Sequence, residues 1–66
     1  MGWCSGTDLF DKVIDAIPKN DLSVALFEKI IGAFEDNDWD CQGESKHYAN
    51  PMFRIAMDRL HPENYD

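Results

Sequence analysis

Apolar residues recur at helical spacing in three stretches of the chain. The first stretch forms a single stripe made of Leu9, Phe10, Val13, Ile14 and Ile17. This spacing predicts an amphipathic helix over residues 8–17. Thr7 is the expected N-cap, and Pro18 is expected to end the helix, because the residue before a proline is disfavoured in the helical conformation.

The second stretch is apolar over most of its surface. Its main face consists of Leu22, Leu26, Ile30, Ala33 and Phe34, widened by Val24, Phe27 and Ile31. We expect a central helix over 22–36, capped by Asp21 or Ser23, with other helices packed on two of its sides. Gly32 lies inside this helix, and the close approach of another helix would explain a residue of such low helix propensity.

The third stretch begins at Asn50-Pro51, which joins a preferred N-cap residue to a residue suited to the first helical position. Its apolar stripe consists of Met52, Phe53, Ala56, Met57 and Leu60. These features predict a helix over 51–60 that stops at His61-Pro62.

The predicted fold is therefore all-α, a small three-helix domain with one long acidic loop between the second and third helices. The single domain covers residues 1–66, with an irregular arm at 1–6 and a short tail at 61–66. The predicted core contains Phe10, Ile14, Leu26, Ile30, Phe34, Phe53 and Met57.

The net charge of the chain limits the kinds of molecule that it is expected to bind. The 66 residues include 13 Asp and Glu against 6 Lys and Arg, which gives a formal charge of −7. This charge disfavours direct binding to nucleic acid or to an anionic membrane, because carboxylates repel phosphates, and it favours a basic protein partner. The chain has no apolar run that would span a bilayer and no secretory signal pattern, so we expect a cytoplasmic protein.

The acidic residues form two groups that we predict to bind this partner. The first group shares one face of the first helix and consists of Asp8, Asp11 and Asp15. The second group, which Glu44 extends, consists of Glu35, Asp36, Asp38 and Asp40. If both groups reach one surface, their carboxylates would imitate the phosphates of nucleic acid. The alternative is that they form a solvated face that aids solubility. Trp39 is either an exposed anchor for the partner or a cover for the end of the core.

Two metal sites are suggested by residue type but not by spacing. Asp36, Asp38 and Asp40 match the first ligands of a calcium-binding EF-hand loop, whose turn glycine and closing glutamate are missing here. A Cys₂His₂ zinc site would use Cys4, Cys41, His47 and His61, which lack the short spacings of such sites. We therefore expect no metal and no cofactor.

The two cysteines are expected to be small buried hydrophobic residues, because a disulfide is disfavoured in the cytosol. An arm packed on the loop would nevertheless bring Cys4 and Cys41 together. A nucleophilic Cys–His pair needs a pocket and an orienting third group, for which so small a domain has little room. We therefore predict that the protein is not an enzyme.

Three segments carry a resemblance to known sequences: Met1-Gly2-Trp3-Cys4-Ser5-Gly6-Thr7, Asp38-Trp39-Asp40-Cys41-Gln42 and Leu60-His61-Pro62. In this order they resemble a group of small phage and prophage proteins. The resemblance implies the cytoplasm of a bacterial host as the setting and transfers no functional residues.

Small acidic proteins of that setting are often inhibitors of host defence, including anti-CRISPR proteins and DNA mimics, an analogy of setting and charge. The expected function is the inhibition of a basic host protein that handles nucleic acid. A structural or regulatory phage protein, for example a homodimer, is the alternative, and a metal-binding module is the third option.

Overall fold

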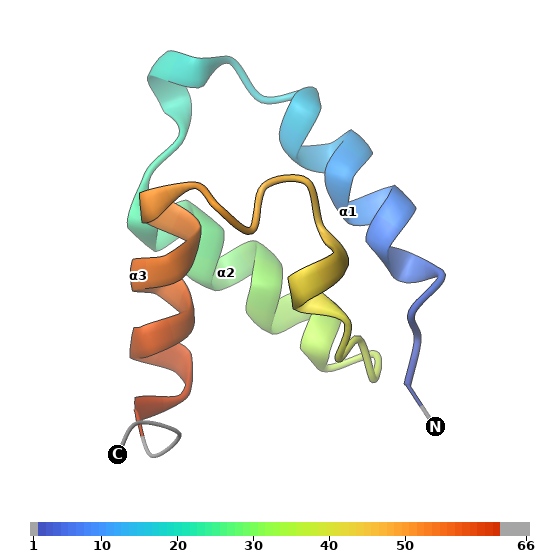
Figure 1. The fold of residues 1–66 in the computed structure, drawn as a ribbon. Helices are drawn as coiled ribbons and strands as arrows, with labels where there is room; N and C mark the ends of the chain where they lie inside the picture. The colour runs from blue at the N-terminus through green and yellow to red at the C-terminus, as the bar shows by residue number, and fades with distance from the viewer. Residues whose placement is uncertain (1, 63–66) are drawn as a thin grey trace.

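The computed structural model describes residues 2–62 and is all-helical, with no strand in this range (Figure 1). Its three α-helices are α1 (Gly6–Asp15), α2 (Val24–Glu35) and α3 (Pro51–Leu60), and two short 3₁₀ turns are η1 (Lys19–Asp21) and η2 (Gln42–Glu44). The predicted all-α class with three helices is confirmed. Of the predicted tail at 61–66, only His61 and Pro62 fall within the described residues. None of the described helices is long and apolar enough to cross a bilayer.

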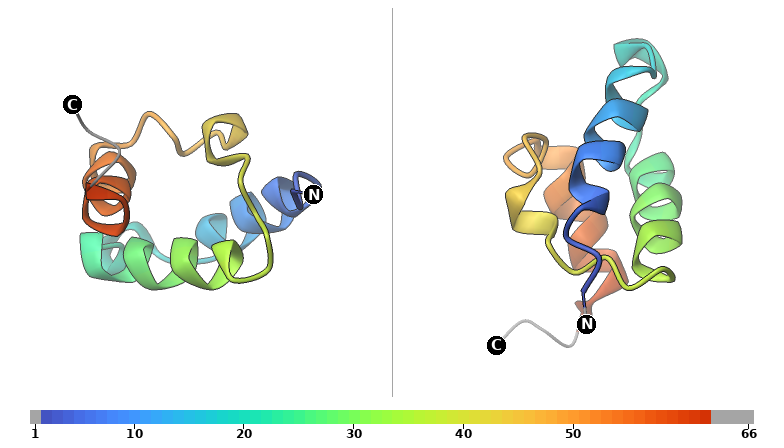
Figure 2. Two further views of the ribbon diagram at one scale, coloured as in Figure 1. Left: turned by 90° about the horizontal axis from the view of Figure 1, so that it is seen from below. Right: turned by 90° about the vertical axis from the view of Figure 1, so that its right-hand side faces the viewer.

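The helices surround a core that the segment after α2 closes. In Figure 2 (left), α2 lies along one side with α3 and α1 toward its two ends, and residues 42–50 pass along the opposite side. This segment covers the side of the core that none of the three helices covers. Ser45 and His47 of this segment bond to Asp11 and Asp15 on α1.

The start of α1 differs from the prediction. The helix begins at Gly6 after Ser5, whose side chain makes no capping hydrogen bond, and it ends at Asp15 rather than Ile17. Thr7 lies inside the first turn and is buried, so its assignment as N-cap is wrong. Its hydroxyl oxygen accepts a hydrogen bond from the Trp39 indole instead.

The caps of the other two helices follow local sequence rules. Ser23, the second of the two candidate caps, accepts a hydrogen bond from the Leu26 amide at 3.1 Å. Asn50 accepts one from the Met52 amide at 2.9 Å, with Pro51 at the first helical position. Each side chain satisfies an amide that the helix itself leaves without a partner. The predicted bounds of α3 are confirmed.

The core differs from the prediction on α2. The fully buried apolar residues are Phe10, Ile14, Phe27, Ile31, Trp39, Phe53 and Ala56. The predicted Ile30, Phe34 and Met57 pack against them while half-buried, whereas Leu26 is not part of this cluster, so its assignment to the core is wrong. Because α2 is apolar on most of its surface, its sequence does not define which side faces inward.

Gly32 has no close helical neighbour. A Cβ atom at this position would lie 3.9 Å from the nearest side-chain atom, on Leu60, which is an ordinary van der Waals contact. The close helix–helix approach expected for Gly32 is therefore wrong.

Candidate functional site

The chain leaves α2 through a Schellman motif that contains an aspartate in place of glycine. The Trp39 amide donates to the Phe34 carbonyl at 3.1 Å, and the Asp38 amide donates to the Glu35 carbonyl at 3.0 Å, the paired bonds of that motif. Asp38 has φ 69°, the left-handed conformation that glycine adopts at no steric cost. The motif turns the chain sharply and sets the directions of the acidic residues that follow.

Trp39 is part of the core, so the interpretation of Trp39 as an exposed anchor is wrong. Only 1% of the residue is exposed. Its ring stacks on Phe10 at 4.5 Å between centroids and meets Phe34 edge-on at 5.6 Å. The contact with Phe34 is the hydrophobic pair that commonly accompanies a Schellman motif. Trp39 therefore covers the end of the core, as the alternative interpretation predicts.

The N-terminal arm packs directly on this turn. The Trp3 amide donates to the Asp38 carbonyl at 2.6 Å, and the Trp3 ring stacks on Phe34 at 5.5 Å. A Cβ atom on Gly6 would lie 2.7 Å from the Trp3 ring, so only glycine lets the helix start beneath the indole. The arm and the turn thus form one structural unit.

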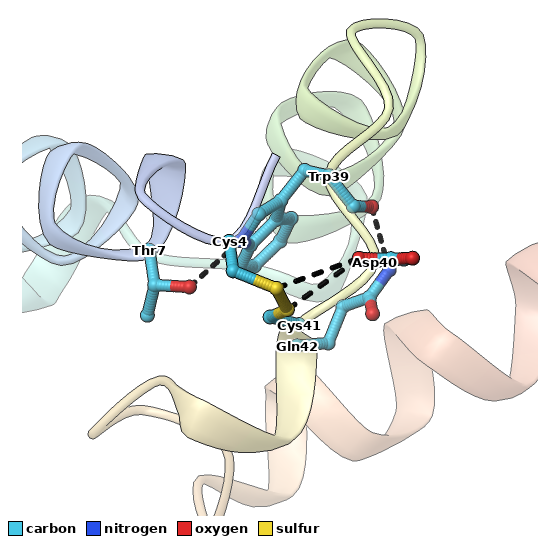
Figure 3. Close-up of a disulfide and its surroundings, with 6 residues drawn as sticks. All are labelled: Cys4, Thr7, Trp39, Asp40, Cys41 and Gln42. Carbon is cyan, nitrogen blue, oxygen red and sulfur yellow. Dashed lines mark hydrogen bonds between the residues drawn. A yellow bond between two sulfur atoms is a disulfide. The ribbon is translucent and has the colours of Figure 1, made fainter. Parts of the chain in front are cut away.

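A disulfide joins the arm to the loop (Figure 3). Cys4 and Cys41 are bonded with their Cα atoms 5.2 Å apart, and Cys4 is exposed while Cys41 is half-buried. The interpretation of both cysteines as small buried hydrophobic residues is therefore wrong. The alternative of an arm packed on the loop describes the observed arrangement, because the bonds of Trp3 to the α2 turn bring Cys4 to this place.

Asp40 lies against both sulfur atoms. Its Oδ1 atom is 3.7 Å from Cys4 Sγ and 3.4 Å from Cys41 Sγ. Gly2 approaches the same carboxylate so closely that a Cβ atom there would collide with it. The side chain of Asp40 is thus directed at the disulfide by the backbone of the arm and of the loop.

The acids of α1 are engaged within the chain. Asp11 accepts hydrogen bonds from the Ser45 hydroxyl at 2.6 Å and from the Lys46 amide at 3.4 Å. Asp15 pairs with Lys46 and with His47, and Asp8 pairs with Lys12 in an exposed i,i+4 pair. The hydrogen bond from Lys46 is the largest of the effects that lower the pKa of Asp15, and that bond in turn raises the pKa of Lys46.

The acids after α2 are less engaged. Asp36 and Asp38 are exposed, and neither side chain has an ionic or hydrogen-bonding partner among residues 2–62. Glu35 is the exception, since it accepts from Gln42 and lies 2.7 Å from His61 Nε2. The turn after α2 therefore presents two carboxylates, those of Asp36 and Asp38, that are not engaged within the part of the chain that the structure describes.

An open groove of about 590 Å³ lies beside these acids. Three carboxylates line it, from Glu35, Asp38 and Asp40, and Met57 adds an apolar side chain. Its full lining consists of Gly2, Glu35, Asp38, Trp39, Asp40, Gln42, Met57 and His61. We call this the acidic groove.

The ligand sets suggested by residue type do not assemble. His47 pairs with Asp15, and His61 pairs with Glu35. The metal-ligating side chains that cluster within the described range are those of Cys4, Cys41 and Glu44. A Cys₂His₂ site, a Cys–His pair and an EF-hand loop on Asp36, Asp38 and Asp40 are all absent from residues 2–62.

Comparison with known proteins adds no family. No family model, no curated protein and no solved structure matches this chain. The candidate site thus rests on the geometry of the chain itself.

The sequence analysis did not predict the hydrogen bond between Thr7 and Trp39. The burial of Trp39, in contrast, has a signal in the nearby sequence. Phe34 and Trp39 lie five residues apart with Asn37 and Asp38 before the second aromatic. That pattern is typical of a Schellman motif, in which the residue after the left-handed position packs back on the helix. This pattern would have predicted that Trp39 packs in the core.

Proposed function

We propose that this chain is a phage-encoded acidic protein that binds and inhibits a basic host protein which handles nucleic acid. The most natural targets are a defence nuclease or a CRISPR effector in the bacterial host cytoplasm. The carboxylates after α2 would occupy the positive surface that otherwise holds phosphates. The resemblance to small phage proteins and the formal charge of −7 support this proposal.

The observation that carries the proposal is the aspartate at a position suited to glycine. Asp38 is exposed and holds a left-handed backbone conformation that is costly for residues with a Cβ atom. Asp36 adds a carboxylate at the C-terminal end of α2, where the helix dipole disfavours negative charge. Asp38 thus departs from the preference for glycine at a left-handed position, and Asp36 departs from the preference against negative charge at a helix C-terminus. Departures of this kind from local sequence preferences are typical of functional sites.

The acidic groove supports a specific mode of binding. A lysine or arginine side chain has an apolar stem and a charged head, and both parts need a suitable environment. Met57 would contact the stem, while Asp38 and Asp40 would receive the head. We therefore expect the target to insert a basic side chain here, with Asp36 facing its positive rim.

The α1 acids have a smaller part in this proposal than the sequence alone suggests. Asp11 and Asp15 already accept hydrogen bonds from the segment at 45–47. Breaking these bonds would offset the gain from a new ion pair, because a lost buried or half-buried hydrogen bond costs about 1 kcal/mol. The sites we favour are Asp36, Asp38 and Asp40.

Affinity capture from a bacterial host lysate tests the proposal. The bait variants are the wild type, a triple variant with Asp36, Asp38 and Asp40 changed to Asn, and a control with Asp21→Asn, Glu28→Gln and Asp58→Asn. The two triple variants carry the same net charge. We expect the wild type and the control to enrich one nucleic-acid-binding protein, and the first triple variant to lose it.

Binding of that protein should weaken steeply with salt and compete with its nucleic acid, because both ligands use the same positive surface. Equal loss in both triple variants would show that only net charge matters. A captured set without any nucleic-acid-binding protein contradicts the proposal and favours a structural or regulatory phage protein.

A further inference from the structure

The disulfide lies among carboxylates that are themselves metal ligands. Asp40 Oδ1 is 3.7 Å from Cys4 Sγ and 3.4 Å from Cys41 Sγ, and both contacts are drawn in Figure 3. A carboxylate oxygen of Glu44 lies within 4.8 Å of both sulfur atoms. We call these four residues the thiol–carboxylate cluster.

Three of the four side chains come from one short segment. Cys41 precedes η2, and Glu44 is the last residue of this 3₁₀ turn. Side chains three residues apart in a 3₁₀ turn lie one above the other, so both project to one side. The two residues between Cys41 and Glu44 are also the short spacing of paired ligands in zinc sites. Only Cys4 has to be supplied from elsewhere, and the arm supplies it.

The two sulfur atoms are bonded to each other here, so the S–S bond must break before a zinc ion fits among the ligands, while Asp40 already lies near zinc-ligand spacing from both sulfur atoms. Zinc binds sulfur at about 2.3 Å and carboxylate oxygen at about 2.0–2.2 Å, so two such ligands lie roughly 3.5 Å apart in a tetrahedron. The separations of 3.4 and 3.7 Å between Asp40 and the sulfur atoms lie on either side of that value. After reduction, the two thiolates would repel each other and the nearby carboxylates of Asp40 and Glu44 unless a cation lies among them.

We propose that the reduced thiol–carboxylate cluster binds one thiophilic divalent cation of the zinc class, and that disulfide formation releases it. In the reducing step, a protein dithiol donates two electrons. The S–S bond breaks, each sulfur takes up one proton, and the reductant leaves as a disulfide. Metal binding then releases both protons to solvent, because thiolates are the ligands. In the releasing step a protein disulfide accepts two electrons from the two thiolates, which re-form the S–S bond, and it leaves as a dithiol after taking up two protons from solvent. Cys4 and Glu44 are exposed, which gives the cation and the reductant access.

Cobalt titration of the whole chain tests the site. The protein is reduced with tris(carboxyethyl)phosphine, freed of it by gel filtration without oxygen, and titrated with Co²⁺ and then Zn²⁺. We expect one Co²⁺ per chain with a thiolate-to-cobalt charge-transfer band, and its displacement by one Zn²⁺, which binds such sites more tightly. The oxidised protein should show no such band.

Variants that keep both cysteines test the carboxylates. Asp40→Asn with Glu44→Gln should weaken binding by about tenfold or more. A matched control, Asp21→Asn with Glu28→Gln, changes the net charge equally and should bind like the wild type. Cys41→Ser should abolish the charge-transfer band, and circular dichroism of each variant reports its fold.

Three results would overturn the proposal. They are equal binding by the oxidised and reduced forms, equal binding by the Asp40/Glu44 variant and the wild type, and no stoichiometric binding by the reduced protein. The assay contains no partner protein, so its outcome is independent of the function proposed above.

Discussion

The indole N–H of Trp39 donates a hydrogen bond of 2.9 Å to the hydroxyl of Thr7, which lies 32 residues earlier in the chain. Thr7 is 8% exposed and Trp39 1% exposed, so water does not replace either partner. This bond ties the turn after α2 to the first turn of α1. It therefore fixes the place where the arm, the disulfide and the acidic groove meet.

Thr7→Val should destabilise the protein by about 1–3 kcal/mol, because it leaves the indole N–H buried without an acceptor while nearly preserving the volume of the side chain. Urea unfolding followed by circular dichroism measures the change. Thr7→Ser retains the hydroxyl and should lose less. If Val and Ser variants unfold at the same urea concentration, the hydrogen bond contributes little to stability.

Removing the disulfide should lower the free energy of unfolding without abolishing the fold. Cys4 and Cys41 are separated by 37 positions, and closing a loop of that length in the unfolded chain stabilises the folded state by about 2–4 kcal/mol. Wild type with reductant and the Cys4→Ser/Cys41→Ser variant should both retain helical signal and unfold at lower temperature. Reductant should not affect the double variant. Loss of all helical signal would show that the bond is required for folding.

Asp38→Gly should stabilise the protein by about 0.5–1 kcal/mol, because relief of the left-handed conformation exceeds the added entropy of the unfolded chain. Ala33→Gly is the control, since Ala33 is exposed in the interior of α2 and glycine there should destabilise by about 1 kcal/mol. Chemical denaturation compares the two. Opposite signs are expected, and a loss of stability in Asp38→Gly would contradict the argument for a conformational cost at this position.

Lys46→Gln should raise the pKa of Asp15 toward its ordinary value, because the hydrogen bond from Lys46 is the largest cause that lowers it. A carboxylate with a lowered folded pKa adds stability above its unfolded pKa of about 3.9, and this stability is lost as the pH falls through the folded pKa. The variant should therefore lose stability at neutral pH and little near pH 2. Carbon-detected NMR titration of Asp15 measures the shift, with Lys29→Gln as a distant control that leaves it unchanged.

The caps of α2 and α3 were predictable because they depend on residues only two or three positions apart. Ser23 bonds the Leu26 amide, and Asn50 bonds the Met52 amide, so the nearby sequence contains both partners. The same rule fails at Thr7, whose partner lies 32 residues away. A hydroxyl serves a cap or a distant donor equally well, and only the fold decides between them.

The placement of Trp39 and of the cysteines depends on the same long-range packing. Acidic neighbours on both sides of Trp39 indicate an exposed residue, but the left-handed turn at Asp38 directs its ring onto Phe34. The disulfide follows from the bond between the Trp3 amide and the Asp38 carbonyl, which no helical period describes. The identity of the partner depends on the surface of another molecule, so the charge pattern of this chain alone does not determine it.

The bond between Cys4 and Cys41 also divides the molecule topologically. It closes a covalent ring that contains α1 and α2, whereas α3 lies outside the ring. A protease that cuts once within residues 5–40 leaves its two fragments linked until a reductant is added, while a cut between residues 42 and 50 leaves α3 with no covalent link to the ring. The packing of Phe53 and Ala56 and the Arg59–Glu28 ion pair therefore hold α3 without help from the disulfide, and detachment of this helix exposes the buried core while the ring stays intact.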